Sequence, residues 1–175
     1  MKWLLTGLAL ALAFAAPANA QDKVRIVVGG KSGVYYLPLS VTERLGYFKD
    51  AGLNVEIIDV AGGSRALQAI VGGSADIGNG NFDHTIQMQA KGQPVIALLQ
   101  YGRYPGFVLA MMAGKAARYK SPADLKGMKI GVTAPGSATQ FMATTMLVRN
   151  GMKADDVSFV ATGATSTAVA AARRA

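Results

Sequence analysis

Short β-branched runs alternate with helical segments along this chain, and glycines separate them. In residues 60–87, Gly62-Gly63-Ser64 leaves a strand and opens a short helix, Gly72-Gly73 ends that helix, and Ala75-Asp76-Ile77-Gly78 forms the next strand. Parallel strands need a connection of this kind, in which a helix leads from one strand to the next. The alternation therefore predicts an α/β fold with a mainly parallel sheet.

The same alternation continues on both sides of this stretch. In the first half we expect strands at residues 24–28, 54–60, 75–78 and 95–99. The first long helix is expected to bury Leu37, Val41, Leu45 and Phe48, which recur at helical spacing. A later helix carries Phe82, Ile86 and Ala90, and this helical spacing argues against a hairpin turn at Asn79-Gly80.

Residues 101–106 (YGRYPG) interrupt the pattern and predict a crossover or hinge. Strands are expected again at 107–112, 129–132 and 157–161, and one helix between them carries Ala138, Phe141, Met142, Thr145 and Met146 on one face. We therefore predict lobe I at 21–101, a crossover at 102–106 and a partial lobe II at 107–175. The last, alanine-rich helix is followed by no strand, so we expect the second lobe to be incomplete and the chain to be a fragment.

The N-terminal residues have the pattern of a targeting segment. Lys2 precedes an apolar run, and Ala18-Asn19-Ala20 supplies a small-x-small cleavage site. The run is shorter than the ~18 apolar residues of a membrane-spanning helix. We predict a signal peptide at 1–20, cleavage after Ala20 and a periplasmic location; an uncleaved anchor is the alternative.

The composition limits the function classes. The chain has no cysteine, so it has neither a disulfide framework nor a thiol nucleophile. Its net charge of +8 is spread singly rather than in basic runs, which argues against nucleic acid as a partner. His84 is the only histidine; beside Asp83 it forms a catalytic pair on paper, but a position on a helix surface is favoured. We predict no metal, no cofactor and no enzymatic activity.

Several loops are expected at the carboxyl edge of the sheet, where ligands bind in open α/β folds. Each loop opens a helix, whose free N–H groups and dipole favour an anion. Ordinary capped turns are the alternative for each loop, and core or hinge packing is the alternative for the aromatic residues. The predicted ligand-binding residues are Ser32, Gly33, Tyr35, Tyr36, Gly62, Gly63, Ser64, Asn79, Gly80, Asn81, Phe82, Tyr101, Gly136, Ser137, Ala138 and Thr139.

Five motifs carry a family resemblance: residues 44–56 (RLGYFKDAGLNVE), 62–64 (GGS), 73–78 (GSADIG), 121–132 (SPADLKGMKIGV) and 135–137 (PGS). In this order and spacing they resemble the substrate-binding proteins of bacterial ABC importers, in particular the nitrate, sulfonate and taurine group and its relatives that bind thiamine-precursor pyrimidines. The resemblance implies a periplasmic binding protein type II-like fold, with two α/β lobes around a ligand cleft.

The resemblance also implies a function. The expected protein is a monomer that captures a small anionic, aromatic or heterocyclic molecule and delivers it to an inner-membrane ABC permease. Residues 33–36 (GVYY) are similar to the TAXI-type binding proteins of TRAP transporters, so a binding protein of this type is the alternative function. An exported α/β enzyme is the alternative from another class. The sequence leaves sulfonate, nitrate, carboxylate, pyrimidine and aromatic ligands open.

Overall fold

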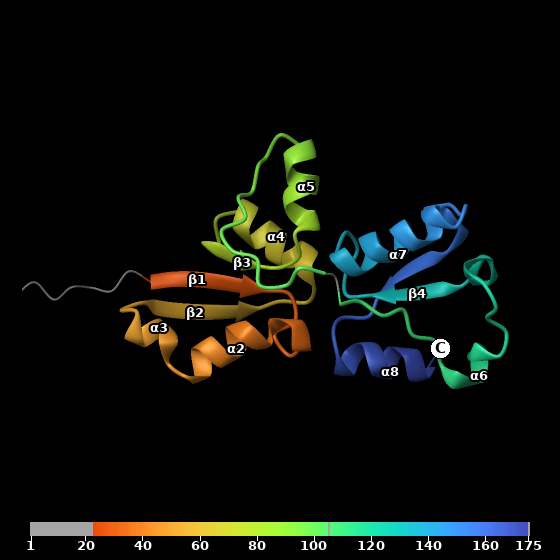
Figure 1. The fold of residues 1–175 in the computed structure, drawn as a ribbon, viewed down its shortest axis with the longest axis horizontal. Coiled ribbons are helices and arrows are strands. Elements are labelled where there is room, and N and C mark those ends of the chain that lie inside the picture. The colour runs from red at the N-terminus through yellow and green to blue at the C-terminus, as the bar shows by residue number, and fades with distance from the viewer. Residues whose placement is uncertain (1–22, 105, 175) are drawn as a thin grey trace, which may run out of the picture.

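The protein contains two parallel sheets, seen side by side in Figure 1. The structure is a computed structural model that describes residues 23–104 and 106–174, so the predicted signal peptide lies outside the described residues. The first sheet has the strand order β2-β1-β3, and the second sheet pairs β4 with β5. The α/β fold predicted from the glycine-bounded alternation is confirmed.

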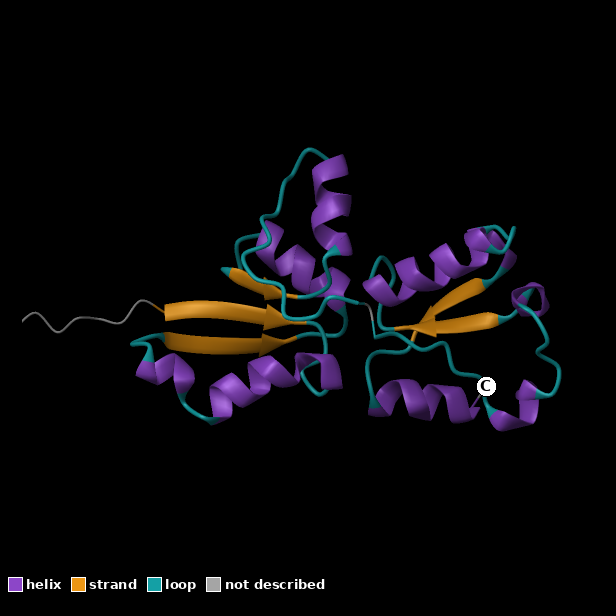
Figure 2. Cartoon of the chain, in the orientation of Figure 1, coloured by secondary structure: helices purple, strands orange, loops and turns teal. Residues whose placement is uncertain are grey.

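The first sheet is built from three parallel strands: β1 (Lys23–Val28), β2 (Asn54–Asp59) and β3 (Ile77–Asn79). Their register places Val28 opposite both Asp59 and Asn79, so all three strands end at one edge. The helical segments of this half are η1 (Val34–Tyr36), α2 (Leu37–Arg44), α3 (Tyr47–Asp50), α4 (Gly63–Val71) and α5 (Asp83–Ala90). Helices α2 and α3 lie on one side of the sheet, and α4 and α5 lie on the other (Figure 2).

The second sheet joins β4 (Lys129–Val132) and β5 (Ser158–Ala161), again in parallel. The helical segments of this half are α6 (Ala113–Ala116), η2 (Pro122–Leu125), α7 (Ala138–Arg149), η3 (Ala154–Asp156) and α8 (Ser166–Arg174). In Figure 1 the strands of the first sheet point toward the second sheet, and β4 points back toward the first. The loops at the carboxyl ends of both sheets therefore face one another.

Each sheet has its own apolar core. In the first sheet, Ile26 and Val28 pack with Leu39 on the α2 side, whereas Val27 packs with Ala66 on the α4 side. This division follows from the alternation of side chains along β1. The core of the second sheet consists of Leu125, Ile130, Val132, Ala143, Leu147 and Val157. Among the described residues, no helix is long and apolar enough to cross a membrane.

Leu147→Ala is expected to destabilise the chain because the Leu147 side chain is 0% exposed in the second core. Removing a buried leucine side chain leaves a cavity, and the expected loss of unfolding free energy is about 3 kcal/mol. Val148→Ala is the matched control, since Val148 is 58% exposed one position further along α7, and its expected effect is below about 0.5 kcal/mol. Urea denaturation measures both; equal losses would contradict this assignment of the core.

Arg25 and Asp76 join β1 to the start of β3. The Arg25 Nη2 and Nε groups donate to the two carboxylate oxygens of Asp76 at 2.7 and 3.2 Å, and the Arg25 backbone N–H donates to Oδ2 at 2.8 Å. The same guanidinium donates to the carbonyl oxygen of Gly73 at 3.1 Å. The pair therefore fixes the turn between α4 and β3.

The Asp76 carboxyl is expected to titrate far below its ordinary range. Hydrogen bonds from Arg25, first from its side chain and then from its backbone N–H, lower the Asp76 pKa to about 2. The pair therefore stabilises the fold above the ordinary aspartate pKa, and this contribution is lost as the pH falls through about 2. NMR titration of the carboxyl carbon measures the midpoint. In Arg25→Ala the midpoint should return to the ordinary range; an unchanged midpoint would rule out Arg25 as its cause.

The buried faces of two helices differ from the prediction. Leu37 and Val41 on α2 are exposed, as is Leu45 just after it, and the buried residues that pack on the sheet are Tyr36 and Leu39. The physical reason is that α2 is short and follows η1, so its rotation is set by the loop after β1 rather than by its widest apolar stripe. Phe48, on α3, packs against this core as predicted. In α7 the buried residues are Ala138, Ala143 and Leu147, and Phe141 points toward solvent.

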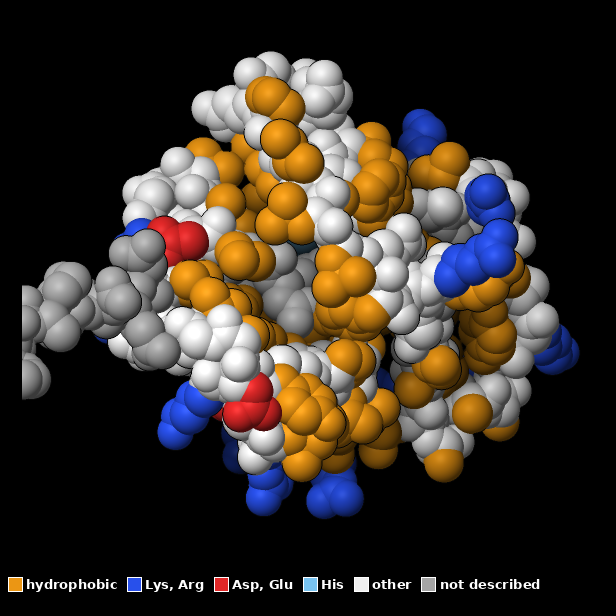
Figure 3. All heavy atoms as spheres, turned by 60° about the vertical axis from the view of Figure 1, so that its left-hand side comes forward, with side chains coloured by type: hydrophobic (Ala, Val, Ile, Leu, Met, Phe, Trp, Pro, Cys, Tyr) orange, Lys and Arg blue, Asp and Glu red, His pale blue; other side chains and the backbone are white. Residues whose placement is uncertain are grey.

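The strands predicted at 95–99 and 107–112 are absent, because residues 93–104 and 106–112 lie outside helices and strands. Ile96 and Val108 are 81% and 87% exposed. A strand needs a neighbour for its backbone groups, and within the described residues none pairs with these segments. Apolar side chains are prominent on the face shown in Figure 3.

Candidate functional site

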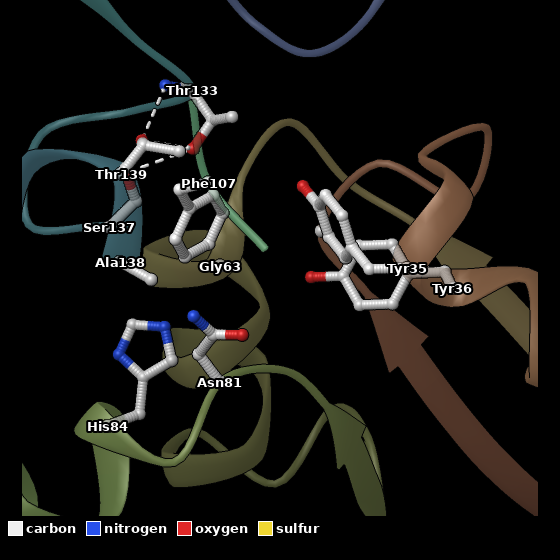
Figure 4. A pocket seen from close by; sticks show the side chains of 11 residues that line it. Tyr35, Tyr36, Gly63, Asn81, His84, Phe107, Thr133, Ser137, Ala138 and Thr139 are labelled. Atoms are coloured by element: carbon white, nitrogen blue, oxygen red, sulfur yellow. Dashed lines mark hydrogen bonds between the residues drawn. The ribbon is translucent and has the colours of Figure 1, made fainter. Parts of the chain in front are cut away.

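A small cavity lies between the facing edges of the two sheets, and we call it the inter-sheet cavity. Its volume is about 10 Å³, room for about one water molecule. Figure 4 shows its lining from close by. The residues that line it are Gly29, Tyr35, Tyr36, Gly63, Asn81, His84, Phe107, Thr133, Ser137, Ala138 and Thr139.

The loop after β1 places two tyrosines on one wall. Asp59, at the end of β2, accepts hydrogen bonds at Oδ1 from the backbone N–H groups of Gly30 and Lys31, at 3.0 and 2.9 Å. This holds the loop across the sheet edge and leads directly into η1, which carries Tyr35 and Tyr36. Their hydroxyl groups point toward the side where Asn81 and His84 lie (Figure 4).

The loops after β2 and β3 supply the next wall through the first turns of α4 and α5. Gly63 is the first residue of α4, and His84 is the second residue of α5. A Cβ at Gly63 would lie 2.7 Å from His84 Nε2, so only glycine allows this approach. The two helix starts therefore meet at the cavity.

Three hydroxyls form the wall that belongs to the second sheet. Thr133 Oγ1 donates to Ser137 Oγ at 2.9 Å, Ser137 Oγ and Thr139 Oγ1 are 2.8 Å apart, and the Thr133 backbone N–H donates to Thr139 Oγ1 at 3.0 Å. The Gln140 side chain accepts from the backbone N–H of Gly136 at 2.7 Å. These bonds fix the loop after β4 and the start of α7.

His84 is buried, so the prediction that it lies on a helix surface is wrong. Only 7% of the residue is exposed. Its nearest charged neighbour is Asp83, at 3.7 Å from Nδ1 to Oδ2, and neither ring nitrogen has a hydrogen-bond partner within the described residues. Burial lowers the pKa of the imidazole, although the charge of Asp83 opposes this, so the ring is neutral at pH 7. Burial likewise raises the pKa of Asp83.

An aromatic contact bridges the cavity. The rings of Tyr35 and Phe107 meet edge to face with centroids 5.8 Å apart, and Tyr35 also packs on Tyr36 at 4.5 Å. Burial raises the pKa of both tyrosines. Phe107 follows the predicted crossover, so this contact ties the segment between the sheets to the loop after β1.

Seven of the sixteen predicted ligand-binding residues line the inter-sheet cavity: Tyr35, Tyr36, Gly63, Asn81, Ser137, Ala138 and Thr139. Others hold the two sheets together around it. Ser32 Oγ is 3.0 Å from Thr165 Oγ1, a Cβ at Gly62 would lie 2.9 Å from Ala134 Cβ, and a Cβ at Gly136 would lie 3.8 Å from Ser64 Cβ.

The remaining predicted residues lie outside the lining. The Tyr101 hydroxyl donates to the side-chain oxygen of Asn79, and Phe82 is largely exposed. Gly33 and Gly80 belong to the loops that lead into η1 and α5. The assignment of these residues to a ligand stays a prediction.

Sequence reasoning missed four lining residues: Gly29, His84, Phe107 and Thr133. Gly29 and Thr133 directly follow β1 and β4, so the rule that placed the other loops could have found them. His84 is one helical turn before the buried Met88, a spacing that could have indicated an inward position.

A second hollow of about 320 Å³ lies on another side of the sheet junction and is lined by Ala61, Ser64, Arg65, Gln68, Thr133, Ala134, Pro135, Ala161 and Gly163. Arg65 and Gln68 are exposed there. Of these two hollows in the described part of the chain, the inter-sheet cavity is the one that combines a buried unpartnered side chain with helix starts from both halves. Among the described residues, no group of three His, Cys, Asp or Glu side chains is placed to hold a metal ion.

The two parallel α/β sheets, the first with the strand order β2-β1-β3, match the fold of type II periplasmic binding proteins over about half of their length. A solved structure of a protein from Bordetella bronchiseptica RB50 matches with a TM-score of 0.84 and 52% sequence identity, over 88% of this chain and 48% of that chain. The alkanesulfonate-binding protein SsuA from Xanthomonas axonopodis pv. citri, solved bound to MOPS, matches with a TM-score of 0.56 and 22% identity over 87% and 51%.

The model of the NMT1/THI5-like family matches residues 33–175, and the chain belongs to this family. A curated relative is a 4-amino-5-hydroxymethyl-2-methylpyrimidine phosphate synthase of Saccharomyces cerevisiae, 28% identical over 81% of this chain and 41% of the relative. The chain thus spans about half the length of the solved structures and about two fifths of this relative. The predicted membership of this group is confirmed.

Proposed function

We propose that the chain acts as an exported solute-binding protein that captures a small anionic, aromatic or heterocyclic molecule between two lobes and delivers it to an inner-membrane ABC permease. One observation carries the proposal: loops from both sheets supply the walls of one cavity. A ligand that contacts both walls favours the closed arrangement and shifts the equilibrium toward it. The permease would recognise that closed form.

The chemistry of the lining favours binding over turnover. Tyr35 offers an aromatic face, the starts of α4 and α7 offer backbone N–H groups, and the hydroxyls of Thr133, Ser137 and Thr139 are already engaged with one another. A ligand site of this kind combines apolar area with a few placed polar groups. The cavity is too small for such a ligand as it stands, so uptake requires the two sheets to move apart.

The test is a binding panel on the purified chain with benzenesulfonate, taurine, nitrate, benzoate and 4-amino-5-hydroxymethyl-2-methylpyrimidine. Thermal shift and isothermal titration calorimetry detect binding, and mass spectrometry examines the recovered ligand. We expect at least one ligand to bind and to return chemically unchanged. Failure of the whole panel would contradict the proposal for these classes.

An enzymatic function is the second candidate, because the curated relative from Saccharomyces cerevisiae is named as a phosphate synthase. The buried Asp83 and His84 side chains are the titratable pair that such a function would use first. Chemical conversion of a panel member, lost in His84→Ala, would favour the enzyme.

A TAXI-type TRAP role is distinguished by the neighbouring genes, which would encode a TRAP permease rather than an ABC permease and ATPase.

A further inference from the structure

The His84 imidazole is a buried polar group without a partner at the point where the two sheets meet. Its two ring nitrogens and Asp83 Oδ1 are the buried side-chain atoms that lack a hydrogen-bond partner within the described residues. Burying a polar group without a hydrogen-bond partner is unfavourable. A ligand that supplies a hydrogen-bond partner to His84 would recover this cost.

Three helix starts surround the same position. Gly63 begins α4, Ala138 begins α7, and His84 is in the first turn of α5; these helices have nine, twelve and eight residues. All three residues line the inter-sheet cavity. The dipole of each helix places about half a positive charge at its start. In α5 the N–H groups of His84 and Thr85 already donate to the carbonyl oxygens of Asn81 and Phe82, so α5 contributes its dipole rather than these donors. The combined field favours a negatively charged group.

The described lining residues include no lysine or arginine that could balance a full negative charge. His84 can supply that charge, since an anion beside an imidazole favours its protonated form. Without an anion, the effect of burial on the His84 pKa outweighs that of Asp83, and the ring is neutral. With an anion on one side and Asp83 on the other, the two negative charges together outweigh burial and favour the protonated ring.

The geometry points to proton-coupled capture of an organic oxyanion, a sulfonate or a carboxylate, in which His84 takes up a proton as the anion binds beside Gly63 and Ala138. The proton comes from solvent and is added to a ring nitrogen, and no bond of the ligand is made or broken. The inference rests on the proposed binding function and names both the ligand class and its pH dependence.

The groups that face His84 come from several elements. Asp83, on α5, lies at Nδ1 and stabilises the imidazolium once it forms. Tyr35 and Tyr36, on η1, have raised pKa values and stay neutral below pH 8. The other lining residues come from the loops after β1, β3 and β4, from the starts of α4 and α7 and from the segment between the sheets. None of them titrates in this range: Gly29, Asn81, Thr133, Gly63, Ser137, Ala138, Thr139 and Phe107.

The sign of the pH dependence follows from these states. The free site is neutral and the occupied site is protonated, so the occupied state binds more protons and affinity rises as the pH falls. The rise reaches about tenfold per pH unit between the His84 pKa of the occupied site and that of the free site. Below both values the affinity levels off.

The experiment compares benzenesulfonate with benzenesulfonamide, which has nearly the same shape but is uncharged between about pH 5.5 and 8. Calorimetric titrations of the purified chain are run in bis-tris and in Tris, because sulfonate and phosphate buffers would compete for the site. We expect benzenesulfonate to bind with uptake of about one proton, seen as a buffer-dependent heat, and to bind more tightly at low pH. The sulfonamide should bind weakly and without a pH slope.

His84→Gln and His84→Asn keep hydrogen-bonding atoms but cannot titrate. Both should bind benzenesulfonate without proton uptake and without a pH slope. A slope that persists in them assigns the proton to another group, such as Asp83, and overturns the inference. If neither variant folds, NMR of the unaltered chain decides, because His84 is the only histidine and its imidazole signals must shift to the protonated form when benzenesulfonate binds; unchanged signals overturn the inference.

The outcomes separate this inference from the binding function on which it rests. Benzenesulfonate binding without proton uptake overturns the inference and leaves the binding function intact, as does equal binding of the uncharged sulfonamide. Binding of neither probe nor of any panel member overturns both.

Discussion

The double variant Ser64→Cys, Gly136→Cys is expected to hold the inter-sheet cavity shut when oxidised. A Cβ at Gly136 would lie 3.8 Å from Ser64 Cβ, which is the typical Cβ separation in a disulfide. Ser64 belongs to α4 of the first sheet and Gly136 to the loop before α7 of the second, so the bond would join the two halves. The chain has no other cysteine to compete.

The oxidised variant should bind ligand at least about a hundredfold more slowly than the reduced variant, because uptake requires the sheets to separate. Stopped-flow measurement with the best ligand of the panel, before and after addition of dithiothreitol, gives the ratio. The two single-cysteine variants are the controls; Gly136→Cys also isolates the strain of a side chain at a φ of 74°. Equal rates in both redox states would show that ligand enters without opening.

Gly63→Ala is expected to remove most of the ligand affinity while α4 still forms. The added methyl group would lie 2.7 Å from His84 Nε2, so the imidazole must leave its position between the helix starts. Alanine favours helix over glycine by up to about 1 kcal/mol, and position 63 has no positive φ that would strain it. We expect at least tenfold weaker binding, about 1.4 kcal/mol.

Gly114→Ala is the matched control, since a Cβ at Gly114 in α6 would meet nothing within 4 Å. Calorimetry gives the two affinities, and thermal unfolding followed by circular dichroism shows whether the fold persists. Unchanged affinity in a folded Gly63→Ala variant would contradict the contribution of this approach to the site.

The parts of the fold that depend on residues close together in the sequence could be predicted. The strands ending at Val28, Asp59 and Val132 are followed by glycine turns and helix starts, and each was found because strand period and turn residues act within a few positions. The parallel arrangement of these strands could be predicted because a helix connects each strand to the next. The absent strand at 95–99 shows the limit: an apolar run becomes a strand only where another strand pairs with it.

The site residues that follow the carboxyl ends of the strands could be predicted, because the α/β topology alone brings these loops together. Tyr35, Gly63 and Ser137 follow strand ends, so the rule for open α/β sheets found them. His84 was misplaced because the predicted face of α5 was set by Phe82, Ile86 and Ala90, whereas the helix is turned so that His84 and Met88, one turn apart, are buried. Phe107 was missed because its contact with Tyr35 joins positions far apart in sequence.

Within the described residues, the backbone passes from the first sheet to the second a single time. Closure of the cavity is therefore an intramolecular reaction, in which each half presents itself to the other at an effective concentration on the order of millimolar. Ligand affinity should accordingly be independent of protein concentration. If the chain were divided within the predicted crossover, the same closure would become a bimolecular encounter, and the two pieces would have to be mixed at comparable concentrations to restore it.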